Sequence, residues 1–186
     1  LNSVKDSREI HLGIVAPDGR DGMMQHAREF HEMGIPFMFD PGQGLPMYNG
    51  DELLNFMQQA NYIAVNDYEA QLLQDRTGYK LESLANKDKV LIITLGANGS
   101  VIYAEGKKIE IPCVEPREIV DPTGCGDAYR AGLLYGIVKS LDWQTTGQLG
   151  SLLGSLKIAH RGGQNHQFTR EEIDQAYFEN FGARIF

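Results

Sequence analysis

A glycine-containing turn in front of an apolar helix is the part of the sequence whose residue types most clearly suggest chemistry. Residues 121–127 read Asp-Pro-Thr-Gly-Cys-Gly-Asp, and the apolar stretch 128–138 follows directly. Glycines let a backbone pass close to a ligand, and the first N–H groups of a helix have no acceptor within that helix. Because the helix dipole adds roughly half a positive charge at the same end, this turn is predicted to bind an anion such as a phosphate.

An acidic residue, Asp127, lies in the first turn of that predicted helix. An exposed carboxylate at this position is ordinary, since its interaction with the helix dipole contributes less than about 1 kcal/mol. Beside a bound anion, however, a carboxylate repels its neighbour unless it accepts a proton from a hydroxyl that attacks the anion. Asp127 is therefore a candidate general base, and a plain helix-capping turn stays open as the alternative interpretation.

Two further motifs have both a structural and a functional interpretation. Asn66 and Glu69 match a capping box, which explains them structurally. A carboxylate at the carboxyl end of a parallel strand also lies where open α/β sheets bind ligands, and it could hold hydrated Mg²⁺ through water. Residues 94–99, Thr-Leu-Gly-Ala-Asn-Gly, are fully explained as a hairpin turn, and a nucleotide lying across that turn is the alternative.

Short apolar runs alternate with amphipathic stretches, which is typical of strands and helices that build a parallel sheet. Strands are predicted at 12–16, 35–39, 62–65, 90–95, 100–104 and 107–111, and helices at 22–33, 51–59, 66–76, 126–140, 143–160 and 169–179. Only glycine-containing turns separate the last three strands, which indicates antiparallel pairing. We therefore predict a doubly wound α/β fold with a mostly parallel sheet, helices on both faces and an antiparallel edge, as a single domain over residues 1–186.

Small residues recur on two of these helices. They form the rows Ala128, Gly132, Gly136 and Gly147, Gly150, Gly154. Each glycine costs helix propensity on the order of 1 kcal/mol relative to alanine. Close packing of one helix against the other is the predicted reason for them.

The composition excludes several classes of protein. The 186 residues carry a net charge of −8 and are 42% hydrophobic, which is typical of a globular protein and disfavours binding to nucleic acid or to an anionic membrane. No run of about 18 apolar residues occurs, and the first residues lack the pattern of a signal peptide. Cys113 and Cys125 are too few for a disulfide framework, so we expect free thiols in a cytoplasmic protein. P-loop, GxGxxG and zinc-ligand spacings are absent.

The segment 121–132, Asp-Pro-Thr-Gly-Cys-Gly-Asp-Ala-Tyr-Arg-Ala-Gly, closely resembles the second signature of the ribokinase-like, or PfkB, carbohydrate and nucleoside kinases, usually D-T-x-G-A-G-D. The order of the motifs agrees, because Asn66-x-x-Glu69 resembles the N-x-x-E motif of the family. Thr94-Leu95-Gly96-x-x-Gly99 likewise resembles its T-x-G-x-x-G nucleotide loop. Within the family, Pro122, the pair at 129–130 and the turn at 40–43 look most like bacterial adenosine kinases.

The resemblance implies transfer of the γ-phosphoryl group of ATP, with Mg²⁺, to a hydroxyl of a nucleoside, adenosine being favoured, or of a sugar. It implies that Asp127 takes the hydroxyl proton. It implies that the N–H groups of Gly124, Cys125 and Gly126 form the anion hole. It implies that Asn66 and Glu69 position phosphate and hydrated Mg²⁺, and that Glu69 does so through water. Thr94, Gly96 and Gly99 are implied to lie along the nucleotide.

Two points stay open at this stage. K⁺ is a further cofactor in the family, bound mostly by backbone carbonyls, and the sequence alone does not show whether this protein uses it. A homodimer is one assembly that we consider. One departure from the family pattern is Cys125, where the family usually has alanine.

A second departure concerns length. Family members have about 300 residues, and the 186 residues resemble their carboxy-terminal portion only. We therefore expect a fragment without the substrate-reading half, which alone has little activity. The alternatives are a non-catalytic nucleotide-binding or regulatory module, and a structural or oligomerisation domain that uses the rows of small residues.

Overall fold

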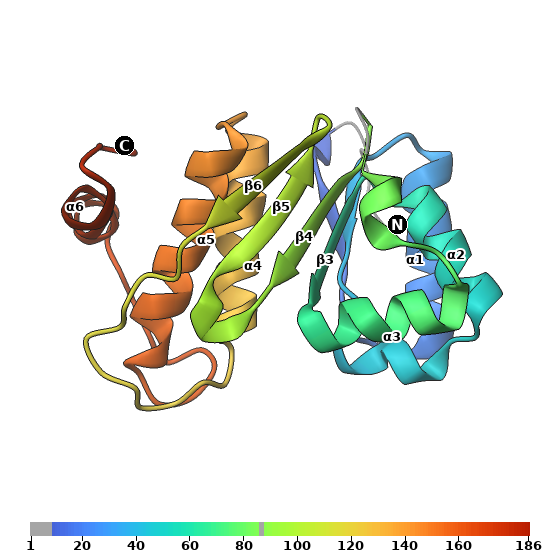
Figure 1. Cartoon of the computed structure of the whole chain (residues 1–186), viewed down its shortest axis with the longest axis horizontal. Helices are drawn as coiled ribbons and strands as arrows, with labels where there is room; N and C mark the ends of the chain where they lie inside the picture. Colours follow the sequence, from blue (N-terminus) through green and yellow to red (C-terminus); the bar gives the residue numbers. More distant parts are fainter. Residues whose placement is uncertain (1–8, 86–87) are drawn as a thin grey trace. The chain divides into compact units, whose positions relative to one another are not determined.

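The computed structural model of the protein describes residues 9–85 and 88–186. They fall into two compact units, which Figure 1 colours along the chain. Unit 1 comprises Leu1–Leu95 and Val101–Ile109, and unit 2 comprises Gly96–Ser100 and Glu110–Phe186. The single domain over residues 1–186 stays a prediction, since a division into compact units does not decide whether they fold separately.

Unit 1 alternates strands and helices along the chain. Its elements are β1 (Gly13–Val15), α1 (Arg20–Glu32), β2 (Phe37–Phe39), the 3₁₀-helix η2 (Gly42–Met47), α2 (Gly50–Gln59), β3 (Tyr62–Asn66), α3 (Asp67–Thr77), the 3₁₀-helix η3 (Leu81–Leu84) and β4 (Val90–Thr94), followed by β5 (Ser100–Ala104) and β6 (Lys107–Ile111). The six strands form one sheet in the order β1-β2-β3-β4-β5-β6. The first four are parallel, and Figure 1 shows β5 running opposite to β4 and β6.

Strand β2 of this sheet is buried on both faces. Phe37, Met38 and Phe39 are each 0% exposed, although successive side chains of a strand point to opposite faces. Strands covered on both faces are typical of parallel α/β sheets. The predicted α/β fold with a mostly parallel sheet and an antiparallel edge is therefore confirmed.

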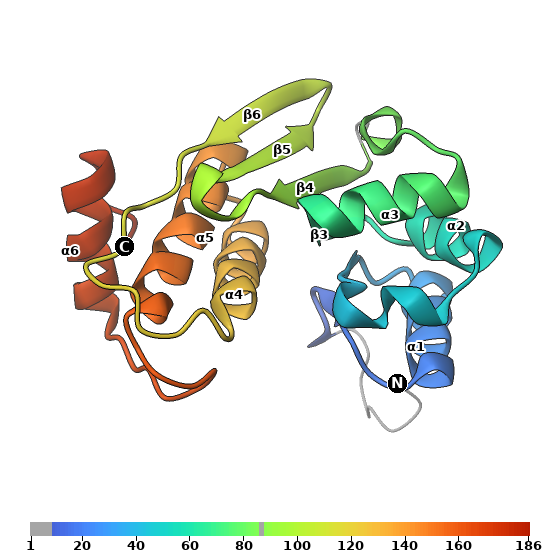
Figure 2. The same cartoon turned by 60° about the horizontal axis from the view of Figure 1, so that its bottom comes forward.

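Unit 2 is mainly helical. It contains the 3₁₀-helix η4 (Gly96–Asn98) and the helices α4 (Cys125–Val138), α5 (Trp143–Ile158) and α6 (Arg170–Phe181). Figure 2 shows α4 and α5 side by side, with α6 beside α5. A Cβ at Gly132 of α4 would lie 2.6 Å from Cα of Gly150 on α5. The predicted helix packing along the small residues is therefore confirmed.

Within the two described ranges, no helix combines the length and the apolar character needed to cross a membrane.

Candidate active site

The glycine turn in unit 2 has the backbone conformation that an anion site requires. Gly124 is the N-cap of α4 and has φ 81°, a left-handed conformation that residues with a Cβ adopt at a cost. A Cβ there would also lie 3.0 Å from Cα and from the carbonyl oxygen of Gly163. Only glycine satisfies both conditions at position 124.

Two of the three predicted N–H donors have no protein acceptor. In the described part of the chain, the N–H groups of Gly124 and Gly126 make no hydrogen bond. The N–H group of Cys125 donates instead to the carbonyl oxygen of Pro122 at 3.1 Å and closes the turn. An anion at this helix end therefore meets two unused donors, and it competes with Pro122 for the third.

Asp127 lies in the first turn of α4 and its side chain is exposed. A basic residue lies close by, because a Cβ at Gly126 would come within 2.7 Å of Nη1 of Arg130. The guanidinium therefore lies over the glycine turn and adds positive charge where the helix dipole is positive. The sequence signal for Arg130 is its spacing of four residues from Gly126, which puts both on one face of the helix.

The residue that begins the turn, Asp121, is held by backbone donors on two sides. Its Oδ1 accepts from the N–H group of Thr123 at 2.9 Å, and its Oδ2 accepts from the N–H group of Gly162 at 2.8 Å. The hydrogen bond from Gly162, followed by those from Thr123, lowers the pKa of Asp121 to about 2. The carboxylate therefore stays ionised at neutral pH and ties the turn to the segment after α5.

A buried lysine supports the same turn, and the sequence interpretation missed it. Lys157 near the end of α5 is 0% exposed, and its Nζ donates to the carbonyl oxygen of Asp121 at 2.8 Å. Cys125 lies close to this charge, and burial raises the pKa of the Cys125 thiol although Lys157 opposes the rise. The sequence signal was that Lys157 is the one charged residue in the glycine-rich stretch 143–158.

Tyr129 anchors α4 from its second turn. Its hydroxyl lies 2.6 Å from Oγ of Ser100, and it is 8% exposed. Burial raises the pKa of Tyr129 to about 12, so the phenol stays neutral at physiological pH. The start of β5 and the helix α4 are thereby connected within unit 2.

In unit 1, three of the predicted residues meet where β3 and β4 end. The N–H group of Glu69 donates to Oδ1 of Asn66 at 2.7 Å, and the N–H group of Asn66 donates to Oε2 of Glu69 at 2.9 Å. The predicted capping box at the start of α3 is thus confirmed. Thr94 is the register partner of Asn66, so all three lie at the carboxyl edge of the parallel strands.

The remaining two predicted residues, Gly96 and Gly99, form a tight turn in unit 2. Their φ angles are 58° and 83°, and the N–H group of Gly99 donates to the carbonyl oxygen of Gly96 at 3.1 Å. A Cβ at Gly99 would lie 2.9 Å from the N atom of Cys113 and closer still to the carbonyl oxygen of Ile111. The turn is the 3₁₀-helix η4, which the hairpin prediction did not include.

The described residues contain no group of three or more His, Cys, Asp or Glu side chains that could hold a metal ion by themselves. Mg²⁺ in phosphoryl-transfer sites is usually bound by one or two carboxylates together with substrate phosphates and water. Glu69 fits that pattern, since a carboxylate has about four lone-pair sites and its Oε2 uses one of them in the capping box. Glu69 can therefore cap α3 and still accept hydrogen bonds from water around a cation.

Comparison with known proteins agrees with this geometry. The nucleoside kinase of Methanocaldococcus jannaschii is 36% identical over 135 residues, which cover 73% of this chain and 45% of that protein. The structure of Burkholderia thailandensis nucleoside kinase in complex with inosine matches with a TM-score of 0.94 at 49% identity, covering 97% of this chain and 60% of that one. A second structure of the same kinase is in complex with ADP-inosine.

The chain spans about half the length of the curated relatives it matches. The family model described as pfkB family carbohydrate kinase matches residues 11–170, which is most of the chain. The protein therefore belongs to the pfkB family of carbohydrate kinases.

Proposed function

We propose that the protein acts as an ATP-dependent nucleoside kinase. The observation that carries the proposal is the glycine turn at the start of α4, with two unused N–H donors and an exposed carboxylate one residue further on. The similarity to nucleoside kinases from two organisms supports a nucleoside over a sugar as the acceptor. Inosine, found in a complex of one of them, stands beside adenosine as the first substrate to test.

In this proposal each residue has a defined task in the transfer. The hydroxyl oxygen of the nucleoside attacks the γ-phosphorus of ATP, and the bond from that phosphorus to the bridging oxygen breaks, so that ADP leaves. Asp127 accepts the hydroxyl proton. The N–H groups of Gly124 and Gly126, with the guanidinium of Arg130, stabilise the negative charge on the transferring group.

The remaining predicted residues have supporting tasks. Mg²⁺ supplies charge neutralisation to the phosphates when it is bound. Glu69, which Asn66 orients, would accept hydrogen bonds from water bound to Mg²⁺. Thr94, Gly96 and Gly99 would lie along the nucleotide. The cytoplasm as compartment and the homodimer as assembly stay predictions from the sequence.

The test measures ADP release by the protein expressed from its complete reading frame, with ATP, Mg²⁺ and a panel of acceptors. We expect turnover with adenosine and inosine and much slower turnover with ribose and fructose 6-phosphate. Turnover with sugars alone would refute the nucleoside assignment. Binding of ATP in calorimetry without any turnover would favour the regulatory module, and neither binding nor turnover would favour the structural domain.

A matched pair of substitutions separates the capping role of Glu69 from its proposed role near Mg²⁺. Glu172 makes the same capping box with Thr169 at the start of α6. Glutamine preserves the capping hydrogen bond in both places and removes the charge. We expect Glu69→Gln and Glu172→Gln to lose the same small amount of thermal stability, because both lose a favourable interaction with a helix dipole.

The kinetic effects of the two substitutions are expected to differ. In Glu69→Gln, the Mg²⁺ concentration that gives half-maximal activity rises by about tenfold, as is typical when a partner of metal-bound water is lost. In Glu172→Gln it stays at the wild-type value. An equal Mg²⁺ requirement in the two variants would leave Glu69 with the capping role alone.

A further inference from the structure

Lys157 is a buried positive charge whose partners are backbone carbonyls. The side chain is 0% exposed, and its Nζ donates to the carbonyl oxygens of Asp121 at 2.8 Å and of His160 at 3.0 Å. A buried ammonium is costly unless hydrogen bonds and nearby negative charge compensate for lost water. These two carbonyls provide that compensation, one from each of two chain segments: Asp121 lies 36 residues before Lys157, and His160 lies three residues after it.

Other hydrogen bonds join the same two segments. The N–H groups of Val120 and Asp121 both donate to the carbonyl oxygen of Ile158, at 2.9 and 3.0 Å. The N–H group of Gly162 donates to the carboxylate of Asp121. We call the contact of 120–121 with 157–162 the lysine clamp. Gly124 lies close to Gly163, the residue that follows the clamp, so the glycine turn adjoins the clamp.

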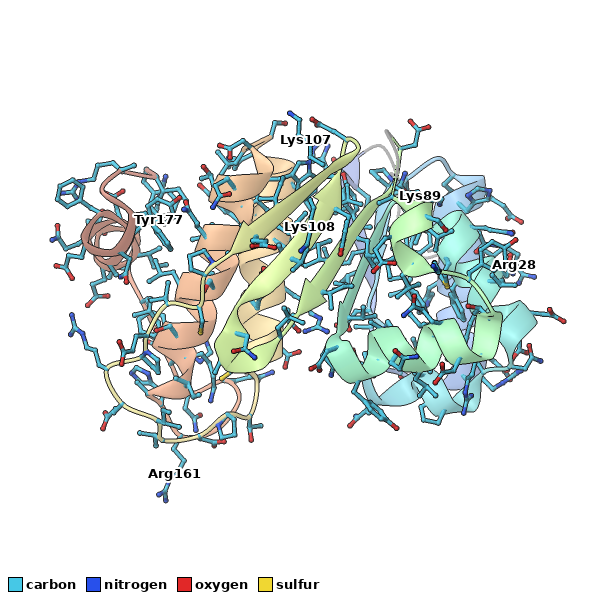
Figure 3. The ribbon with its side chains drawn as sticks, viewed as in Figure 1. Arg28, Lys89, Lys107, Lys108, Arg161 and Tyr177 are labelled. Carbon is cyan, nitrogen blue, oxygen red and sulfur yellow. The ribbon has the colours of Figure 1, made fainter. Side chains whose placement is uncertain are left out.

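The clamp bears on the question of K⁺. Backbone carbonyl oxygens that converge in a buried place are the ligands that a monovalent cation takes from a protein, and here they already receive an ammonium group. A second cation does not fit beside it, since like charges repel strongly at short distance in a buried place. The next arginine or lysine along the chain is no substitute, because Arg161 is exposed and projects away from the loop (Figure 3).

We propose that Lys157 is a positioning residue which supplies the protein with its own cation. It holds the glycine turn in the conformation that binds an anion. The turn therefore keeps this conformation without added K⁺, and turnover does not require K⁺ either. The statement about turnover rests on the proposed kinase function. The statement about the turn rests only on the clamp.

The first experiment measures kcat in chloride salts of K⁺, Na⁺ and tetramethylammonium at equal ionic strength. The wild-type protein is expected to show the same kcat in all three salts. Lys157→Ala is expected to lose kcat by about 10²-fold in tetramethylammonium, because small misplacements of binding groups have such effects. K⁺, NH₄⁺ or methylammonium should restore kcat of this variant along a saturating curve. Arg161→Ala, which removes an exposed charge from the same segment, should behave like wild type.

The second experiment needs no turnover, so it separates failure of the clamp from failure of the kinase assignment. A cation that binds only the folded variant raises its unfolding temperature. Lys157→Ala should therefore melt at a higher temperature in K⁺ or NH₄⁺ than in tetramethylammonium, whereas wild type and Arg161→Ala should not distinguish these salts. Lys157→Leu, which keeps part of the stem and leaves the place of the ammonium group empty for a cation, replaces Lys157→Ala if the latter does not fold.

A wild-type protein whose turnover or unfolding temperature depends on K⁺ would overturn the proposal. So would a folded Lys157 variant whose unfolding temperature and kcat are the same in every salt. Restoration of both quantities by small cations is not expected of a lysine that only fills space.

Discussion

Replacing Asp127 by asparagine is expected to lower kcat for nucleoside phosphorylation by a factor of about 10² to 10⁴. Asparagine has the same shape and keeps the polar end group, but it cannot accept the proton of the attacking hydroxyl. The side chain is exposed in the first turn of α4, so the substitution leaves the packing of that helix intact. The KM for ATP should change little, because the lost interaction belongs to the transition state.

The matched control is Asp51→Asn. Asp51 is also exposed in the first turn of a helix, α2, and loses the same charge. Steady-state kinetics and thermal unfolding of both variants separate catalysis from helix stability. If Asp127→Asn keeps wild-type kcat, Asp127 is a capping residue and the base assignment is wrong. A rise in the ATP KM with unchanged kcat would move Asp127 from catalysis to binding.

Replacing Gly132 by alanine is expected to destabilise unit 2 by about 2 kcal/mol or more. The new Cβ would lie 2.6 Å from Cα and 2.7 Å from N of Gly150, and backbone atoms cannot move aside as a flexible side chain can. The helices α4 and α5 must therefore separate. The gain in helix propensity, about 1 kcal/mol, offsets only part of this cost.

Gly154→Ala on α5 is the control for that gain. The nearest atom to its Cβ would be the carbonyl oxygen of Cys125 at 3.5 Å, an ordinary contact. We expect this variant to gain up to about 1 kcal/mol. In a chain of this length the unfolding temperature changes by about 2–4 °C per kcal/mol, so the two variants should shift it in opposite directions. A Gly132→Ala protein as stable as Gly154→Ala would show that α4 and α5 do not approach as closely as described.

The features that the sequence predicted well are local ones. The turn at 121–127 and the capping box of Asn66 and Glu69 both lie within a few neighbouring residues, so residue types and spacing indicate them directly. Most of the strands were predictable because they are short apolar runs, and Ser100–Ala104 has the predicted bounds. The tight turn at 96–98 was predicted as a hairpin connection without its 3₁₀ hydrogen bonding.

Features that depend on distant residues could not be predicted in the same way. Lys157 donates a hydrogen bond to a carbonyl oxygen 36 residues before it, and the residues around either position do not indicate this partner. Its sequence context suggested only a helix with small residues. The use of the Cys125 N–H group by Pro122 also escaped prediction, because the glycine pattern shows that donors exist without showing which are occupied.

The junction of β3 and α3 places the edge of the sheet under an unusual constraint. The strand ends at Asn66 and the helix begins at Asp67, so no residue of connecting loop lies between them. A slip of one residue in the pairing of β3 turns its side chains to the opposite faces of the sheet. The pairing of Asn66 with Thr94 consequently also determines where Glu69 lies. Chain length can be added elsewhere in unit 1, in its loops, without moving this carboxylate, but not at this junction.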